Sequence, residues 1–192
     1  MSNLEDEGAR LSRRISDERR ARKWSLADLA DRSGVSKAML SKVERGEASP
    51  TAQVLVRIAS AFGETLAGLL TAADGPSAGL LRLADQESWT DPASGYRRRQ
   101  IYLSASLPLE LVEVELPAGA SVSVPAAAYR LIRQVAWVIE GRLTICEGSS
   151  RAELAAGDRL EFGPPSDVVF RNDGSAACRY LVTVLRNQST SK

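Results

Sequence analysis

In the first 70 residues, apolar side chains recur every three or four positions, which is the spacing of amphipathic helices. Ser25 and Ser36 are suitable N-caps, and Gly34 and Gly46 are suitable left-handed helix ends. We predict five short helices, at residues 9–24, 26–33, 36–46, 49–63 and 65–70. Helices this short bury little surface alone, so we expect them to pack as one bundle.

After residue 79 the helical spacing gives way to short runs in which apolar and polar residues alternate. The stretch "LELVEVELPAG" (109–119) is typical of a half-buried strand, and "VAWVIEGRLTICEG" (135–148) predicts two strands around a turn at Glu140 and Gly141. Many short strands of this kind indicate a sandwich or small barrel. Residues 71–79, "TAADGPSAG", have no periodic pattern and predict a linker between a domain at 1–70 and one at 80–192.

The charge is distributed unevenly along the 192 residues, although the formal net charge is only +1. Residues 8–46 contain 11 lysines and arginines against 5 acidic residues, whereas residues 71–192 contain 13 against 14. A basic N-terminal part on a neutral remainder indicates a polyanionic partner. A solvated charged helix face is the alternative.

Several function classes are disfavoured by composition. No apolar run is long enough to span a membrane, and the polar, acidic start "MSNLEDEGAR" is not typical of a secretory signal, so we expect a cytoplasmic protein. Cys146 and Cys178 form neither a disulfide framework nor a zinc-finger spacing. The chain has no histidine, so the commonest general base and transition-metal ligand is missing.

Residues 25–45 predict two helices joined by the tight turn "SGVS", an arrangement that suits a helix-turn-helix whose second helix enters the DNA major groove. The run "LADLADRSGVSKAMLSKVERGEASP" (26–50) resembles the Cro/phage-repressor-like (XRE) family of transcriptional regulators, and the resemblance covers about residues 10–70. It implies a five-helix lambda-repressor-like domain. The matching residues are Leu29, Ala30, Gly34, Val35, Ser36, Leu40, Ser41, Glu44, Gly46, Pro50, Leu55, Ile58 and Ala59.

The resemblance implies that double-stranded operator DNA is the partner. Lysine can donate to guanine acceptors and Ala38 could meet a thymine methyl group, while the amides at the helix starts would lie near phosphates. Leu26 stands where many relatives carry a phosphate-clamping glutamine, which leaves that contact in doubt. The implied DNA-binding residues are Ser25, Ser36, Lys37, Ala38, Ser41, Lys42 and Arg45. The alternative is an exposed polar face of a protein-binding bundle.

Glu44 lies on the second helix of the motif, where an unpaired carboxylate would repel DNA. The family pattern pairs it with a cation from the first helix, here Arg19, so the resemblance implies a structural ion pair. A single domain of this kind has a small footprint, and operators are usually bound by dimers on half-sites one helical turn apart. We therefore expect a homodimer, with a tetramer left open.

Three stretches of the strand-rich part, "LPAG" (116–119), "WVIEGRLTI" (137–145) and "GDRLEFGPPSDVVFRN" (157–172), resemble the small cupin barrels, also called double-stranded β-helices. The resemblance implies an α+β multidomain chain with an all-β C-terminal barrel. Metal-binding cupins use histidines and a glutamate, but these positions hold Gln134, Val168 and the stretch "AAYR" (127–130). We therefore expect no metal, no cofactor and no enzymatic activity.

A barrel without metal can still bind a small molecule among apolar and polar groups. The candidate effector pocket comprises Tyr129, Arg130, Arg133, Gln134, Trp137 and Val168, and a carboxylate effector would suit either arginine. Alternatively, the aromatic residues belong to the core or a dimer interface and the arginines are solvated. The run "YRRRQ" (96–100) predicts an exposed, charged edge strand.

Together these observations predict a sequence-specific DNA-binding transcriptional regulator, such as a repressor. The helix-turn-helix domain would read its operator as a homodimer, and a metal-free cupin domain would dimerise and sense a small-molecule effector. Two alternatives remain open from the sequence: a cupin enzyme fused to a DNA-binding domain, and an antitoxin-like protein-interaction module.

Overall fold

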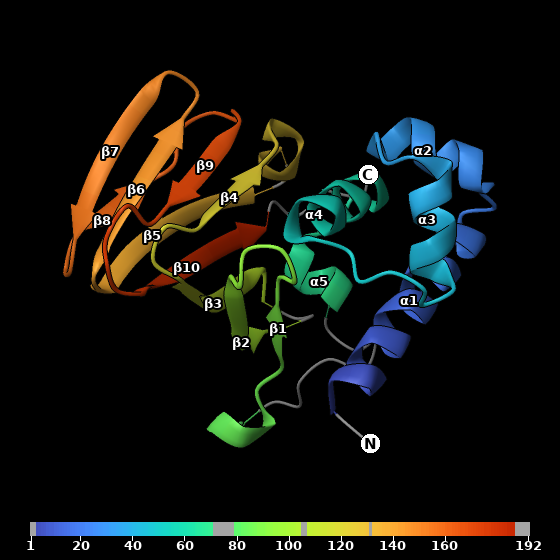
Figure 1. The fold of residues 1–192 in the computed structure, drawn as a ribbon, viewed down its shortest axis with the longest axis horizontal. Coiled ribbons are helices and arrows are strands. Elements are labelled where there is room, and N and C mark those ends of the chain that lie inside the picture. Colours follow the sequence, from blue (N-terminus) through green and yellow to red (C-terminus); the bar gives the residue numbers. More distant parts are fainter. Residues whose placement is uncertain (1–2, 71–78, 105–106, 131, 187–192) are drawn as a thin grey trace. The chain divides into compact units, whose positions relative to one another are not determined.

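The computed structural model describes residues 3–70, 79–104, 107–130 and 132–186 of the chain (Figure 1). The chain divides into two compact units, Met1–Leu70 and Thr71–Lys192. Except for Gly79, the predicted linker lies outside the described residues.

The first unit consists of five helices. Their apolar faces meet in a core whose largest side chains, among them Ile15, Leu29, Leu40 and Leu55, are fully buried. This confirms the five-helix fold predicted from the spacing of apolar residues. The helices are α1 (Asn3–Ala21), α2 (Leu26–Ser33), α3 (Lys37–Glu44), α4 (Ala52–Phe62) and α5 (Leu66–Leu70).

Two helix ends differ from the prediction. Helix α1 ends at Ala21, so Trp24 lies outside it and packs against Phe62 with the ring centroids 6.0 Å apart. Helix α4 begins at Ala52, because Thr51 rather than the first turn around Pro50 provides the N-cap. Both differences leave the helices in the predicted order.

The second unit consists of two antiparallel sheets, which confirms the predicted β-rich domain. The strands are β1 (Ser88–Thr90), β2 (Arg97–Leu103), β3 (Leu109–Leu116), β4 (Ser121–Val124), β5 (Ile132–Glu140), β6 (Arg142–Glu147), β7 (Ser150–Ala155), β8 (Arg159–Glu161), β9 (Val168–Arg171) and β10 (Cys178–Arg186). One sheet has the order β1-β2-β3-β10-β5-β8 and the other the order β4-β9-β6-β7. Two short 3-10 helices, η1 (Leu83–Asp85) and η2 (Ala126–Tyr129), complete the unit.

The two sheets bury one face each, as successive side chains of a strand point to opposite sides. In the six-stranded sheet, Val114, Tyr180 and Val138 form one buried row across three neighbouring strands. In the four-stranded sheet, Ile145 and Phe170 are paired and buried. The interior of the unit is therefore built from the alternate residues of each strand.

The hairpin between β5 and β6 turns at Gly141, where the sequence predicts it. This glycine has a φ of 82°, and a Cβ atom placed on it would lie 3.0 Å from the carbonyl oxygen of Ala177. Because both the backbone angle and the close approach oppose a side chain, glycine is required here.

Candidate nucleic-acid interface and barrel interior

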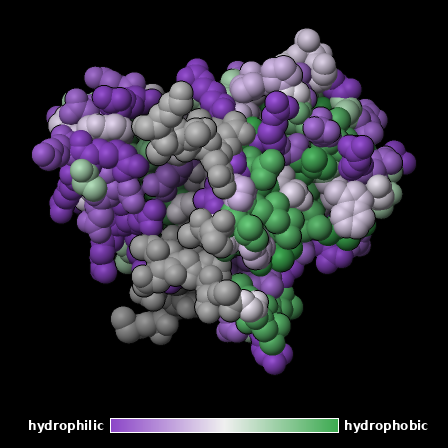
Figure 2. All heavy atoms as spheres, turned by 180° about the vertical axis from the view of Figure 1, so that it is seen from behind, coloured by the Kyte–Doolittle hydropathy of each residue, from purple (hydrophilic) through white to green (hydrophobic). Residues whose placement is uncertain are grey.

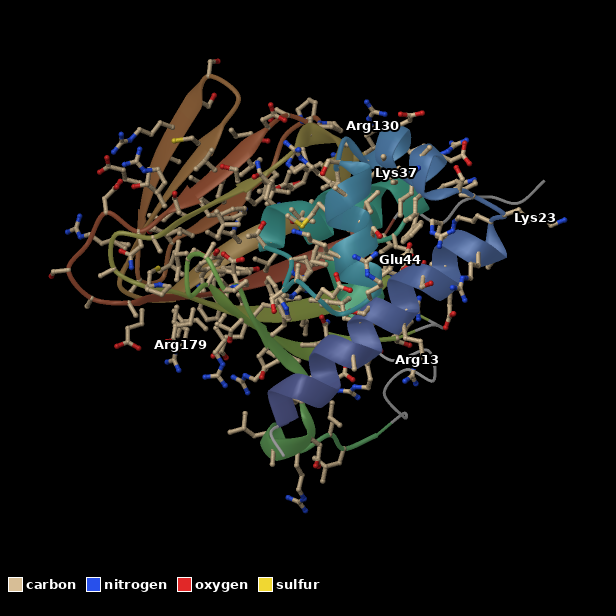
Figure 3. The ribbon with its side chains drawn as sticks, turned by 45° about the vertical axis from the view of Figure 1, so that its right-hand side comes forward. Arg13, Lys23, Lys37, Glu44, Arg130 and Arg179 are labelled. Carbon is tan, nitrogen blue, oxygen red and sulfur yellow. The ribbon has the colours of Figure 1, made fainter. Side chains whose placement is uncertain are left out.

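Helix α3 buries one side and exposes the other. Leu40 and Val43 have no exposed surface, whereas Lys37, Ala38 and Lys42 are exposed. Ala38 and Lys42 are four positions apart and so lie one above the other, and Lys37 adjoins Ala38 at the start of the same exposed side. Figure 3 shows Lys37 and Glu44 at opposite ends of α3. The flank on the exposed side is therefore cationic and has short side chains beside its lysines.

The start of α3 is better suited to an anion than the start of α2. The Ser36 hydroxyl accepts a hydrogen bond from the Met39 amide at 3.2 Å, and the first turn of α3 contains no acidic residue. At the start of α2, the Ser25 amide donates to the Asp28 carboxylate at 2.7 Å. Hydrogen bonds from Ser25 lower the pKa of Asp28, so this end already holds a negative charge. A phosphate at Ser25 would meet that carboxylate.

Glu44 is held by Arg19 of α1. The Arg19 Nε donates to Glu44 Oε1 at 2.6 Å, and its Nη2 donates to Oε2 at 2.7 Å. The Arg19 Nη1 also donates to the Trp24 carbonyl at 2.8 Å. The two side chains are 13% and 9% exposed. This two-armed contact fixes the C-terminal end of α3 and neutralises its carboxylate.

Arg45 is exposed but already paired. Its Nε and Nη2 donate to Glu47 at 2.6 Å each, and its Nη1 contacts the Ser41 hydroxyl. The charge of Arg45 is therefore partly balanced, unlike the charges of Lys37 and Lys42, for which no ion pair is found among the described residues.

The sequence interpretation passed over Met39, which is 38% exposed. It lies three residues before Lys42, so helical spacing could have placed it beside the cationic flank. It also missed the packing role of Arg22, whose guanidinium carbon lies 4.9 Å from the Phe62 ring centroid while Nη2 donates to the Phe62 carbonyl at 2.9 Å. A basic run alone gives no signal for such a role.

The structure does not bring the six predicted pocket residues together. Tyr129, Gln134 and Val168 are buried, whereas Arg130, Arg133 and Trp137 are exposed. On β5 the cause is strand alternation: Gln134 points inward, and residues an odd number of positions away point to the other face. The exposed Trp137 instead donates its Nε1 hydrogen to the Gly157 carbonyl at 3.1 Å.

The prediction that residues 96–100 form an exposed, charged edge strand is wrong, because every second side chain of this stretch is buried. Tyr96, Arg98 and Gln100 are 7–9% exposed, because β2 lies between β1 and β3 and turns these side chains inward. The intervening Arg99 donates to Glu113 at 2.6 Å. The interior is therefore more polar than the sequence suggested.

Aromatic rings form a chain through the same interior. Tyr129 stacks on Phe162, Phe162 contacts Phe170, and Phe170 stacks on Tyr180, with centroid distances of 5.8–6.0 Å. Burial raises the pKa of Tyr129 and of Tyr180, which keeps both hydroxyls protonated. The interior thus combines neutral aromatic donors with the inward-facing polar side chains of β2 and β5.

The interior does not fit the metal that many barrels of this fold hold. The chain has no histidine, and the two positions in question carry the amide of Gln134 and the apolar Val168. Within the described residues, no three His, Cys, Asp or Glu side chains gather as a metal site would require.

No helix in the described part of the chain is long and apolar enough to cross a membrane.

Comparison with known proteins agrees with these features. Residues 15–69 match the helix-turn-helix family HTH_3. The HTH-type transcriptional regulator SutR of Escherichia coli K12 is 25% identical over 176 residues, which cover 88% of this chain and 91% of the relative.

Two solved structures share the fold. An HTH_3 family transcriptional regulator from Vibrio cholerae superposes with a TM-score of 0.80 at 22% identity, covering 96% of this chain and 99% of its own. The Fe(II) form of HppE superposes with a TM-score of 0.50 at 17% identity, covering 93% and 99%. At these identities the likeness concerns the fold alone.

The helix-turn-helix match, the regulator relative and the β-rich second unit define the class: a DNA-binding transcriptional regulator. More narrowly, residues 15–69 form the helix-turn-helix domain that matches HTH_3, and a β-rich domain of two antiparallel sheets follows it.

Proposed function

We propose that this regulator acts in the cytoplasm as a homodimer that reads operator DNA through the exposed flank of α3, such as a repressor would. The observation that carries this proposal is the exposure of Lys37, Ala38 and Lys42 on a helix whose other side is fully buried. The Arg19–Glu44 contact supports it, because it removes the carboxylate that would otherwise repel the DNA backbone.

The flank offers two kinds of contact. Lys37 and Lys42 reach into a groove as donors to guanine, with Ala38 and Ser41 small enough to allow a close approach. The amide end of α3 at Ser36 faces a phosphate, which the helix dipole favours. Arg45 can contribute by exchanging Glu47 for a phosphate. Ser25 is the weakest of the proposed contacts, since the Asp28 carboxylate occupies its helix end.

The test is electrophoretic mobility shift with the DNA upstream of the chain's own coding region. Lys37→Ala and Lys42→Ala should each weaken specific binding by about 1–3 kcal/mol and lower the salt dependence. Arg57→Ala is the matched control, because Arg57 is an exposed cation of the same unit on α4. No shift with any upstream fragment at low salt would refute DNA reading and favour an antitoxin-like interaction module. Equal losses in all three variants would refute the assignment of the flank.

We propose that the outward face of the six-stranded sheet joins the two copies. Trp137 and Leu185 are 46% and 48% exposed there, and the register places Leu181 beside Trp137. In the view from behind, hydrophobic residues gather over this unit (Figure 2). The apolar residues of this face are Tyr102, Leu109, Leu111, Val135, Trp137, Leu181 and Leu185. Leaving such a group in water costs free energy, which a partner surface recovers.

A second copy is the occupant that the charges of this face favour. Two of its cations lie beside acids of the same sheet: Arg99 Nη2 is 2.6 Å from Glu113 Oε2, and Arg179 Nη2 is 3.5 Å from Glu140 Oε2. Figure 3 shows Arg179 pointing away from the sheet. A face with internally balanced charge does not repel its own copy. A single helix-turn-helix also needs a partner to span two half-sites.

Light scattering of the purified chain tests the dimer. Leu181→Arg places a charge in the apolar face and should yield monomers that still melt cooperatively. Glu153→Arg, on the exposed side of β7, should leave the dimer intact. A monomeric wild-type chain, or a Leu181→Arg variant that remains a dimer, would refute this interface; a tetramer would call for a further surface.

We also propose that the barrel senses a small molecule and is not an enzyme. The support is the interior itself, which combines aromatic walls and buried polar groups but has an amide and a valine at the metal positions. An effector that prefers one arrangement of the two barrels would change operator affinity by shifting populations. A stoichiometric transition metal in the purified protein would overturn the metal-free assignment and favour the enzyme alternative.

A further inference from the structure

Arg98 is a charged side chain in the barrel interior for which the described residues supply no acid within ion-pair distance. It points inward from β2 in the same row as Val114 and Tyr180, and it is 7% exposed. Within the described part of the chain, its guanidinium forms no ion pair. Its hydrogen bond in that part is a long one, from Nη2 to the Gln100 side-chain oxygen at 3.4 Å.

The buried acids of the interior have partners of their own. Asp91, whose charge also acts on Tyr96, accepts a hydrogen bond from the Ser94 amide at 2.9 Å. Gln100 is fixed by its own donors, which reach the Tyr102 carbonyl at 2.7 Å and the Leu111 carbonyl at 3.2 Å. The buried carboxylate of Glu110 lies instead 3.4 Å from Arg186 Nε. A buried charge without a counter-ion costs several kcal/mol, so its presence needs a reason.

Gln134 is a second polar group of the interior, but it lies apart from Arg98 and has a neighbour of its own. Its Nε2 makes no hydrogen bond of good geometry among the described residues, yet its side chain approaches the Tyr129 hydroxyl closely enough to act against the burial that raises the pKa of that tyrosine. The register places Gln134 four residues along β5 from Val138, which stands in the row of Arg98 three strands away. Arg98 is therefore the buried donor that is short of an acceptor, which a bound oxyanion would supply.

Two buried tyrosines lie within reach of the Arg98 charge. The Arg98 charge acts to lower the pKa of both Tyr96 and Tyr180, while burial raises each of them overall. The Tyr129 hydroxyl lies beside Gln134. These neutral phenols can donate to an anion but cannot supply a negative charge to Arg98.

We propose that the barrel interior binds a small organic monocarboxylate, with Arg98 as its counter-charge, a buried tyrosine hydroxyl as a second donor and the ring of Phe170 or Tyr180 against its apolar part. One unbalanced cation calls for one negative charge. The aromatic chain favours a carboxylate that carries an apolar group over a bare inorganic ion. This inference rests on the proposed effector role of the barrel and gives that effector a charge and a chemical class.

Thermal unfolding of the full chain tests this proposal with isovalerate, benzoate, phenylacetate and indole-3-acetate at constant ionic strength. Each acid is compared with its neutral primary amide. At least one carboxylate should raise the melting temperature in a concentration-dependent way, and its amide should not. The matched control variant is Arg142→Met, which removes an exposed arginine of the four-stranded sheet in the same unit and should keep the response.

Arg98→Met should abolish this stabilisation, and the variant without ligand should melt no lower than wild type, because an uncompensated buried charge is gone. If Arg98→Met does not fold, Arg98→Gln serves in its place and should weaken carboxylate binding at least about tenfold. The proposal is wrong if no acid stabilises more than its amide, or if the folded variant responds like wild type. Operator binding without ligand is read separately in the mobility shift and should persist in Arg98→Met, so failure here is distinct from failure of DNA reading.

Discussion

Removing Glu44 tests how the fold holds α3. In Glu44→Ala, the Arg19 guanidinium loses both carboxylate contacts and keeps, within the described residues, only its bond to the Trp24 carbonyl. Breaking a fully buried ion pair costs about 3–5 kcal/mol. Since these side chains are 13% and 9% exposed, some water reaches them, and we expect a loss of about 2–3 kcal/mol. For a domain of this size the melting temperature should fall by roughly 10–20 °C.

The assay is thermal unfolding of the full chain, followed by the helical circular dichroism signal. Glu47→Ala is the control, because it removes an equally short but half-exposed pair with Arg45 and should leave melting unchanged. The double variant Arg19→Met/Glu44→Met should recover part of the loss, since it buries no unpaired charge. An unchanged melting temperature in Glu44→Ala, or an equal drop in Glu47→Ala, would show that this contact does not anchor the helix.

Three further changes have defined outcomes. Hydrogen bonds from Ser25 lower the pKa of Asp28, so the carboxylate is protonated more readily in the unfolded chain than in the folded one. The resulting stabilisation is present above the ordinary Asp pKa and is lost as the pH falls toward the lowered value. In urea unfolding, Asp28→Asn should therefore lack this dependence of stability on pH. Lys23 has a φ of 58°, so Lys23→Gly should relieve backbone strain and raise the free energy of unfolding by up to about 1 kcal/mol, measured by thermal unfolding. A lower melting temperature in this variant would contradict this. Gly141→Ala should destabilise the barrel more than Gly157→Ala, because both have positive φ but only the former brings a Cβ within 3.0 Å of a carbonyl oxygen; equal melting temperatures would contradict this.

The helical unit could be predicted from sequence because its signals are local. Ser36 and Gly34 mark helix ends within a few residues of the apolar positions that they delimit, and both caps are present in the structure. The sequence also indicated Arg19 and Glu44 as partners, and their atoms lie 2.6 Å apart. The position of Trp24 could not be predicted, because its packing on Phe62 depends on a tertiary contact 38 residues away.

The barrel interior depends on register, which the sequence alone left open. Arg98 lies between two other arginines, and only the pairing of β2 with β3 decides which of the three points inward. For Arg133 and Trp137, strand alternation relative to Gln134 predicts the opposite face, so the sequence already contained the signal that separates them. The fold class was thus within reach of the sequence, whereas the composition of the interior was not.

In each unit, an arginine contacts an acidic side chain, and a different cation has no acidic partner among the described residues. Glu44 is held by an arginine and leaves Lys37 and Lys42 on the exposed flank, while Glu110 is held by another and leaves Arg98 inside the barrel. The Arg19–Glu44 pair is mostly buried, so it gains little by exchanging a partner for an arriving anion, unlike the exposed Arg45–Glu47 pair. The cations without an acidic partner mark where anions are expected. On the exposed flank of α3, the lysines stay hydrated until a polyanion binds. In the barrel interior, one buried cation calls for one small anion.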